Sequence, residues 1–167
     1  MKPTEAVGAV ERQWDERIKT LGWLGYLSSY CSHHQKFPAG ALARLFIPAV
    51  NNKCVRLFES ETGAVCAALI WARLTDQVSE RMIYEALPPT HEEWSEGNNL
   101  WFLDIIAPFD HGRIVARHLA RNPPKGPFYF ARLAKDGRVK KVVKGDAERR
   151  RGRVQAYFLD TLRQEPV

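Results

Sequence analysis

The stretch from Trp94 to Phe109 reads WSEGNNLWFLDIIAPF, and it decides the fold because it sets one acid inside an apolar strand. Alternate side chains of a strand share a face, so Phe102, Asp104 and Ile106 point the same way. An unpaired carboxylate among apolar neighbours is costly, and Asp104 therefore needs a partner. Two interpretations stay open: a structural ion pair with an arginine, or a carboxylate that orients a catalytic base.

A candidate base lies upstream, in the segment CSHHQKFP at residues 31–38. Histidine exchanges protons near neutral pH, which suits general-base catalysis. A carboxylate bound to the other ring nitrogen would fix the tautomer and stabilise the imidazolium. His34 and Asp104 would form such a pair if the fold brings them together.

Taken together, the two segments resemble the toxin-activating lysine acyltransferases, cytoplasmic enzymes that fatty-acylate RTX protoxins. The first motif of that family is a histidine followed, after two residues, by an aromatic residue and proline. His34-Gln35-Lys36-Phe37-Pro38 fits it, with phenylalanine where tryptophan is usual. The second motif leads from tryptophan and glycine into an aromatic-rich strand, an aspartate and Ile-Ala-Pro-Phe. It is matched by Trp94, Gly97, Trp101, Phe102, Asp104, Ile106, Ala107, Pro108 and Phe109.

The resemblance runs from about Gly22 to Phe109. Between the two motifs, residues 45–50 and Trp71 also resemble family positions. The chain departs from the family pattern at two positions. Cys31 stands where a serine is usual, three residues before the histidine, and Asp110 stands where a glycine is more usual. Both departures leave the acceptor open.

The resemblance implies a GNAT-like acyltransferase that usually forms a homodimer. It implies that the donor is acyl-phosphopantetheine on acyl carrier protein, a co-substrate, and that the enzyme binds no cofactor of its own. The acceptor would be an RTX-type protoxin or another protein. His34 would be the base and Asp104 its partner, and Trp71, which lies in a family motif, would contact the acyl donor. Independently of the resemblance, the helix expected from about Gly112, with Arg113, could offer its N-terminus to the phosphopantetheine of the donor.

Lysine acylation explains the need for a base. A free lysine amine has a pKa of about 10.4, so roughly one molecule in 2,500 is uncharged at pH 7. We expect direct transfer from the donor to the amine, although His34 could instead carry the acyl group covalently. The tetrahedral oxyanion needs a donor, which the sequence does not assign.

Composition agrees with a single acyltransferase domain over residues 1–167. The chain is 45% hydrophobic, and no apolar run approaches the ~18 residues of a membrane span. The N-terminus lacks the apolar core of a signal peptide, and three cysteines without a CxxC favour a reducing cytoplasm. The sequence contains no metal-binding motif, so we expect no metal site.

The periodicity predicts an α+β fold with a central, mostly antiparallel or mixed sheet flanked by helices. An amphipathic helix carrying Val7, Val10, Trp14 and Ile18 is expected first, and a second helix over residues 21–30. Trp14, Trp23 and Trp71 are expected in the core. Helices are expected at 41–50, 75–86 and 112–121, and a basic helix at the C-terminus. Hairpins are expected at 53–74, around residues 61–63, and at 128–143, over Asp136-Gly137.

The basic charge is concentrated near the C-terminus. Residues 132–153 contain ten Lys or Arg against three Asp or Glu, a balance of +7, whereas the whole chain carries +6. We expect Arg149, Arg150 and Arg151, on the predicted final helix, to dock an acidic partner. Three alternatives remain: an acyl-CoA-dependent N-acyltransferase with another amine acceptor, a nucleic-acid-binding module, and a noncatalytic interaction domain. No nucleic-acid motif supports the second, so we expect no nucleic-acid partner.

Overall fold

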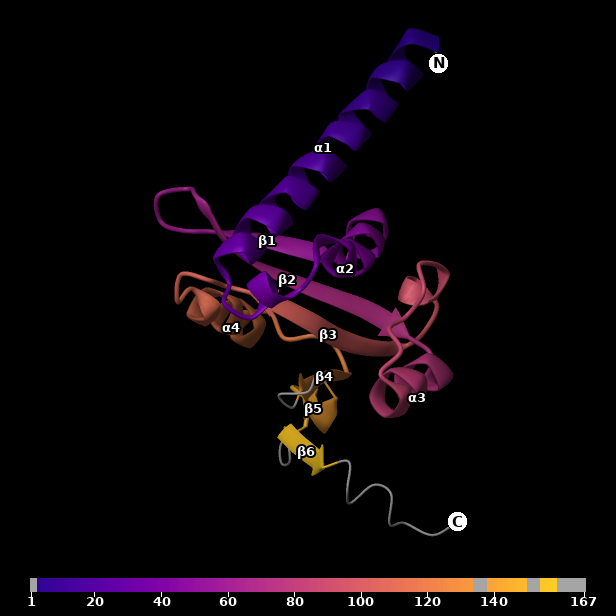
Figure 1. Ribbon diagram of the computed structural model, residues 1–167. Helices are drawn as coiled ribbons and strands as arrows, with labels where there is room; N and C mark the ends of the chain where they lie inside the picture. The colour runs from indigo at the N-terminus through magenta and orange to yellow at the C-terminus, as the bar shows by residue number, and fades with distance from the viewer. Residues whose placement is uncertain (1–2, 134–137, 150–153, 159–167) are drawn as a thin grey trace. The chain divides into compact units, whose positions relative to one another are not determined.

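The computed structural model describes residues 3–133, 138–149 and 154–158. Its α-helices are α1 (Pro3–Tyr30), α2 (Ala39–Asn51), α3 (Asp76–Glu85) and α4 (Gly112–Arg121), and its short 3-10 helices are η1 (His34–Lys36) and η2 (Glu92–Ser95). Its strands are β1 (Val55–Glu59), β2 (Val65–Leu74), β3 (Asn99–Ile106), β4 (Pro127–Leu133), β5 (Val139–Asp146) and β6 (Val154–Phe158) (Figure 1).

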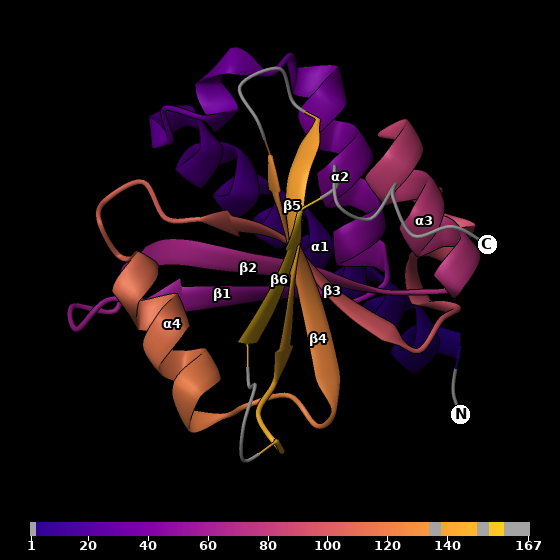
Figure 2. The same cartoon turned by 90° about the horizontal axis from the view of Figure 1, so that it is seen from below.

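The six strands form one sheet in the order β1-β2-β3-β4-β5-β6. Strand β3 pairs with β4 in parallel, with Trp101 opposite Tyr129. Strand β5 pairs antiparallel with both β4 and β6, and the three strands overlap at the centre of the view in Figure 2. The predicted α+β fold with a mixed sheet is therefore confirmed.

The chain divides into two compact units, which we describe separately. The first comprises Met1–Leu69 and Ile105–Val115, and the second comprises Ile70–Asp104 and Ala116–Val167. The single domain expected over residues 1–167 stays a prediction. Apolar side chains are buried in both units. Those of the first include Leu24, Leu27, Phe46, Ala49 and Ile106, and those of the second include Ile70, Leu74, Trp94, Trp101 and Val142.

The N-terminal region is one helix, not the two that the sequence predicted (Figure 1). No helix breaker separates Ile18 from Leu21, and the Thr20 hydroxyl donates to the Glu16 carbonyl within the same helix at 2.8 Å. The prediction that Trp14 belongs to the core is also wrong, because this side chain is 58% exposed. Trp23 and Trp71 are half-buried.

The predicted central elements are confirmed. Strands β1 and β2 flank a turn in which Gly63 has a φ of +79°, a backbone conformation that favours glycine. Helix α3 begins after Thr75, whose hydroxyl oxygen accepts a hydrogen bond from the Val78 N–H at 3.2 Å. Helix α4 has the predicted bounds, Gly112–Arg121.

The C-terminal part of the chain combines one confirmed prediction with one error. Strands β4 and β5 form the predicted antiparallel pair, although the Asp136-Gly137 turn lies outside the described residues. The predicted C-terminal helix is wrong at residues 154–158, because these form strand β6. The segment VQAYF supplies β-branched and aromatic residues, and it pairs along β5. In β5, the buried Gly145 lies opposite Phe128, whose ring occupies the space where a glycine substitution would place a Cβ.

Candidate active site

His34 is the most buried of the predicted catalytic groups, with 4% of its surface exposed. It begins η1, directly after the turn that ends α1. Its ring nitrogen Nδ1 lies 3.0 Å from Sγ of Cys31. The backbone fixes this turn: the Gln35 N–H donates to the Cys31 carbonyl at 3.0 Å, and the Phe37 N–H donates to the His34 carbonyl at 3.0 Å.

The Cys31 thiol has an altered acidity in this turn. Burial raises its pKa, but hydrogen bonds from the His34 side chain and from the backbone N–H groups of His34 and His33 outweigh that effect, and the pKa is lowered overall. Cys31 remains half-exposed, whereas Cys54 and Cys66 are buried. Burial raises the pKa of the Cys66 thiol. Cys31 thus combines partial exposure with a lowered pKa.

His33 differs from its neighbour. It is exposed, and its ring makes edge-to-face contacts with the rings of His34 and Phe37, with centroids 5.4 and 5.1 Å apart. The sequence singled out His34 by its distance from Pro38, and burial distinguishes the same residue. Their different surroundings make His33 a natural control for His34.

The second motif supports β3 with its two tryptophans. Trp94 is 1% exposed, and its indole N–H donates to the Trp71 carbonyl at 2.9 Å. Trp101 is 2% exposed and donates to Oγ of Ser79 at 3.0 Å, while the Ser79 hydroxyl donates to the Thr75 carbonyl at 2.7 Å. Both indoles are buried with their N–H groups paired, as stable packing requires.

Gly97 has no room for a side chain. A Cβ at this position would overlap the backbone of Leu74 and Thr75, and the Gly97 N–H donates to the Arg73 carbonyl at 2.9 Å. The tryptophan-glycine part of the motif therefore holds the segment before β3 against the end of β2.

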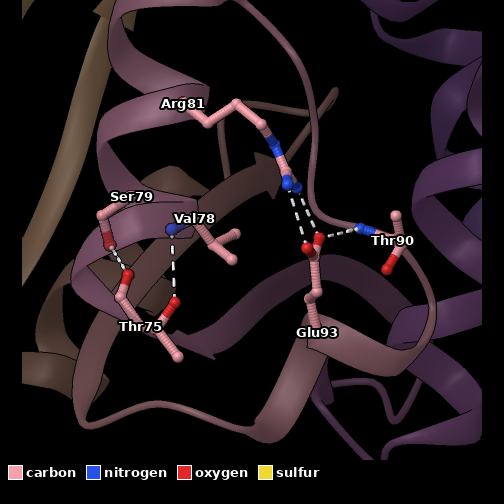
Figure 3. Close-up of polar contacts among 6 residues, drawn as sticks. All are labelled: Thr75, Val78, Ser79, Arg81, Thr90 and Glu93. Carbon is pink, nitrogen blue, oxygen red and sulfur yellow. Dashed lines mark hydrogen bonds and ion pairs between the residues drawn. The ribbon is translucent and has the colours of Figure 1, made fainter.

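An ion pair joins α3 to η2 in the same unit. Figure 3 shows the Arg81 guanidinium directed at the Glu93 carboxylate, with Nη1 3.0 Å from Oε1 and a second contact between Nη2 and Oε2. The Thr90 N–H donates to Glu93 Oε2 at 2.8 Å, which is one half of a capping-box interaction. The Arg81 side chain and the Thr90 N–H lower the pKa of Glu93 to about 2.

The other predicted site residues are distributed over several elements. Asp104 is half-buried on β3 and belongs to the second unit, whereas His34 belongs to the first, so their pairing stays a prediction. Trp71 lies on β2, and Gly112 and Arg113 are exposed at the start of α4. Their contact with an acyl donor stays a prediction.

Of the predicted docking residues, the described Arg149 follows β5 and is not part of a helix. Nε of Arg149 lies 3.3 Å from a carboxylate oxygen of Asp146, the last residue of β5, and Arg149 is about half exposed. Arg150 and Arg151 lie outside the described residues.

The backbone conformation at Asp110 explains why the family pattern usually has glycine at this position. Its φ is +59°, a left-handed conformation that glycine adopts without strain and aspartate tolerates better than most residues. The helix that follows begins at Gly112, so Asp110 is not the residue directly before it. The usual glycine at this position therefore has a conformational reason.

Sequence reasoning missed two groups beside His34. Cys31 was noted only as a departure, although its spacing of three residues from His34 is compatible with contact across one turn. The buried Ser28 hydroxyl, 2% exposed, has no hydrogen-bond partner within the described residues. No sequence signal identifies such an unpaired hydroxyl.

In the described part of the chain, no helix is both long and apolar enough to cross a membrane. The same residues include no group of three or more histidines, cysteines, aspartates or glutamates suited to a metal ion.

The sequence model of the RTX toxin acyltransferase family matches residues 13–155. The RTX-I toxin-activating lysine-acyltransferase ApxIC of Actinobacillus pleuropneumoniae is 27% identical over 125 residues, which cover 75% of this chain and 72% of the relative. The protein-lysine myristoyltransferase RtxC of Kingella kingae is 26% identical over 118 residues, or 71% of this chain and 70% of the relative. An uncharacterised Synechocystis protein is 27% identical over 136 residues, or 78% of this chain and 88% of the relative.

The family match contains both motifs and confirms the resemblance that they carry. The named relatives are lysine acyltransferases of bacteria that differ in genus. With the buried histidine of the first motif and the anchored strand of the second, this chain is an acyltransferase that belongs to the RTX toxin acyltransferase family.

Proposed function

We propose that this protein transfers a fatty acyl group from acyl carrier protein to the ε-amine of a lysine in an RTX-type protoxin. His34 is the general base, and Asp104 orients it. The observation that carries the proposal is the buried His34 ring, held at 3.0 Å from a thiol within the first motif of an acyltransferase family. A protoxin acceptor is favoured because ApxIC, one of the relatives, is named as an RTX-I toxin-activating lysine-acyltransferase.

The proposed chemistry assigns a role to each ring nitrogen of His34. Because Nδ1 faces Cys31, the Asp104 carboxylate of the proposed pair would bind Nε2. That bond would hold the proton on Nε2 and leave Nδ1 as the basic atom. Because the ring is buried, few water molecules can bond to it. The proton that Nδ1 accepts would therefore come from a bound substrate or from a neighbouring side chain.

The partners follow from the same proposal. Acyl carrier protein would present its acyl-phosphopantetheine near Trp71 and the exposed start of α4, where Gly112 and Arg113 lie. Backbone N–H groups and a cationic side chain suit a phosphate at a helix start. The basic C-terminal segment would attract the acidic carrier or acceptor. We further propose that the enzyme works in the cytoplasm as a homodimer.

The test compares two adjacent histidines. His34→Ala and His33→Ala are assayed for transfer from acyl carrier protein to a protoxin lysine, with acyl-CoA as the alternative donor. Because His34→Ala removes the base, its rate of acyl transfer should be about 10²–10⁴-fold lower than that of the wild type. The rate of His33→Ala should stay within a few-fold of the wild-type rate. Circular dichroism establishes that both variants are folded.

The outcome that contradicts the base assignment is a His34→Ala enzyme that retains more than about a tenth of wild-type turnover. Transfer from acyl-CoA to small amines, without transfer to the protoxin, would instead favour the alternative N-acyltransferase. Tight nucleic-acid binding without any acyl transfer would favour the binding module.

A further inference from the structure

The Cys31 thiol is the nucleophilic group in direct contact with the proposed base. Its Sγ lies 3.0 Å from Nδ1 of His34, within the range in which a thiol shares its proton with an imidazole. Nδ1 faces this sulfur, so the Cys31 thiol is a group with which the imidazole can exchange a proton before an amine arrives.

Access separates Cys31 from the other possible nucleophiles. His34 is only 4% exposed, whereas Cys31 is half-exposed beside it. Cys54 and Cys66 are 7% and 3% exposed. A bulky acyl thioester can therefore approach Cys31 more readily than the imidazole or either remaining sulfur.

The turn also favours the charged form of Cys31. Burial opposes ionisation of the thiol, but the His34 ring and the backbone N–H groups of His34 and His33 lower its pKa overall. The lowered pKa places more of the sulfur in the thiolate form, which attacks carbonyl carbon far faster than a thiol.

A second observation concerns Ser28, whose backbone carbonyl bonds to Cys31. The Ser28 hydroxyl is 2% exposed and lacks a hydrogen-bond partner among the described residues. Ser28 also lies three residues before Cys31, and the Cys31 N–H donates to the Ser28 carbonyl at 3.1 Å. An unpaired buried hydroxyl commonly acquires its partner from water or a ligand, and a thioester carbonyl oxygen is a suitable acceptor.

We propose that Cys31 is a catalytic nucleophile that carries the acyl group as a thioester between donor and acceptor, with His34 moving the proton. This inference rests on the proposed acyl transfer. It replaces the direct transfer expected from the sequence with two steps through the enzyme.

The two steps balance. The Cys31 thiolate attacks the donor carbonyl, the bond from carbon to the pantetheine sulfur breaks, and the His34 imidazolium protonates the departing thiolate. The neutral lysine amine then attacks the Cys31 thioester, the bond from carbon to Sγ breaks, and the neutral His34 takes the amine proton. The amide leaves, and the thiolate and imidazolium are restored. Neither step needs an oxidant or a metal.

The first test omits the acceptor. Wild-type enzyme is mixed with fatty-acyl carrier protein, quenched in acid and analysed by peptide mass spectrometry. One acyl group on the peptide that contains Cys31, released by neutral hydroxylamine, is the expected result. The peptides that contain Cys54 and Cys66 are internal controls and should carry none. Cys31→Ala should lose the adduct and more than about 100-fold of transfer activity, and Cys31→Ser should not form a hydroxylamine-labile adduct.

A second measurement needs no acyl donor. Iodoacetamide should alkylate Cys31 at pH 6 at least about tenfold faster in the wild type than in His34→Ala, because the imidazolium stabilises the thiolate. His33→Ala should react like the wild type. Equal alkylation rates in the wild type and His34→Ala would overturn the assigned thiol–imidazole pair.

The outcomes separate this inference from the proposed function. Transfer to the protoxin without a Cys31 adduct, with Cys31→Ala nearly as active as the wild type, overturns the inference and leaves the proposed function intact. A Cys31 adduct without transfer to protoxin supports the inference and removes the proposed acceptor. An acyl group found on His34 alone also overturns it, and so does the absence of both adduct and transfer.

Discussion

The two motifs of this chain have different physical characters. In the second, the Trp94 and Trp101 indoles are buried with their N–H groups paired, and Gly97 has no space for a side chain. In the first, Cys31 is half-exposed beside His34, and the nearby Ser28 hydroxyl is unpaired within the described residues. Satisfied groups maintain a structure, whereas groups with unused bonding capacity are available to a substrate. The second motif thus places paired, buried groups around β3, whereas the turn before the first motif retains groups with unused bonding capacity.

The largest effect on stability is expected from a substitution at Gly97. Gly97→Ala forces a Cβ into the backbone of Leu74 and Thr75, so we expect a loss of stability of about 4 kcal/mol or more, enough to unfold a marginal domain. Thermal melting of the purified protein measures the effect.

The matched control is Gly40→Ala in α2, where a Cβ meets open space. That change should raise stability slightly, by up to about 1 kcal/mol, because alanine is the better helix former. Equal melting temperatures for the Gly97→Ala and wild-type proteins would mean that the tryptophan-glycine segment is not architectural.

Asp104 tests whether the second motif also serves the chemistry. Asp104→Asn keeps the volume of the side chain but would favour the wrong imidazole tautomer, so we expect a rate loss of about 10²–10⁴-fold with little change in melting temperature. Asp76→Asn, an exposed change in the same unit, should leave the rate unchanged. Unfolding of Asp104→Asn, with full activity in the fraction that remains folded, would identify a structural ion pair instead.

The pH dependence of stability tests the ion pair between Glu93 and Arg81. The pKa of Glu93 is lowered to about 2, chiefly by Arg81, so its contribution to stability is present at neutral pH and is lost as pH falls from about 5 towards 2. Melting temperatures measured between pH 7 and pH 2 should fall less steeply for Glu93→Gln than for the wild type. Glu92→Gln, at the exposed neighbouring position, should follow the wild-type curve. Identical slopes for Glu93→Gln and wild type would refute the contribution of this ion pair.

The smallest expected effect concerns the basic segment. Changing Arg149, Arg150 and Arg151 to glutamate should raise the apparent KM for carrier protein or protoxin several-fold at low salt and leave kcat similar, because charge steers association. The wild-type KM should climb with salt, and that of the variant much less. Glutamate at Arg12, Lys19 and Arg44, all exposed and remote in sequence, is the control for net charge. Equal KM values at low salt would make the basic segment a solvated surface.

Local signals in the sequence predicted much of the fold. The hairpin at Gly63, the helix expected over residues 75–86 and the start of α4 at Gly112 each depend on nearby residues, and each is confirmed. Strand β6 was missed because the basic run before it was interpreted as a helix, and the sequence alone does not show that VQAYF pairs with β5. The exposure of Trp14 was missed for a related reason: periodicity indicates a helix face, but not what covers it.

The candidate site divides in the same way. Spacing to Pro38 selected His34, and the structure adds that this histidine is the buried one of the pair. The role of Cys31 was not predicted, because it depends on the turn after α1 that directs Sγ at Nδ1. The reason for a glycine at position 110 likewise became visible only in the backbone angle of Asp110.

The contact between Gly145 and the Phe128 ring limits how the C-terminal strands can align. Sliding β5 by one residue would bring Lys144 or Asp146 opposite the ring, and it would also turn the buried Val142 and Val143 to the opposite faces of the sheet. The glycine opposite an aromatic ring thus favours one register of β4 and β5, because in a shifted register a side chain would clash with the ring. Strand β6 pairs only with β5 among the described strands, and it inherits its position from that single choice of alignment.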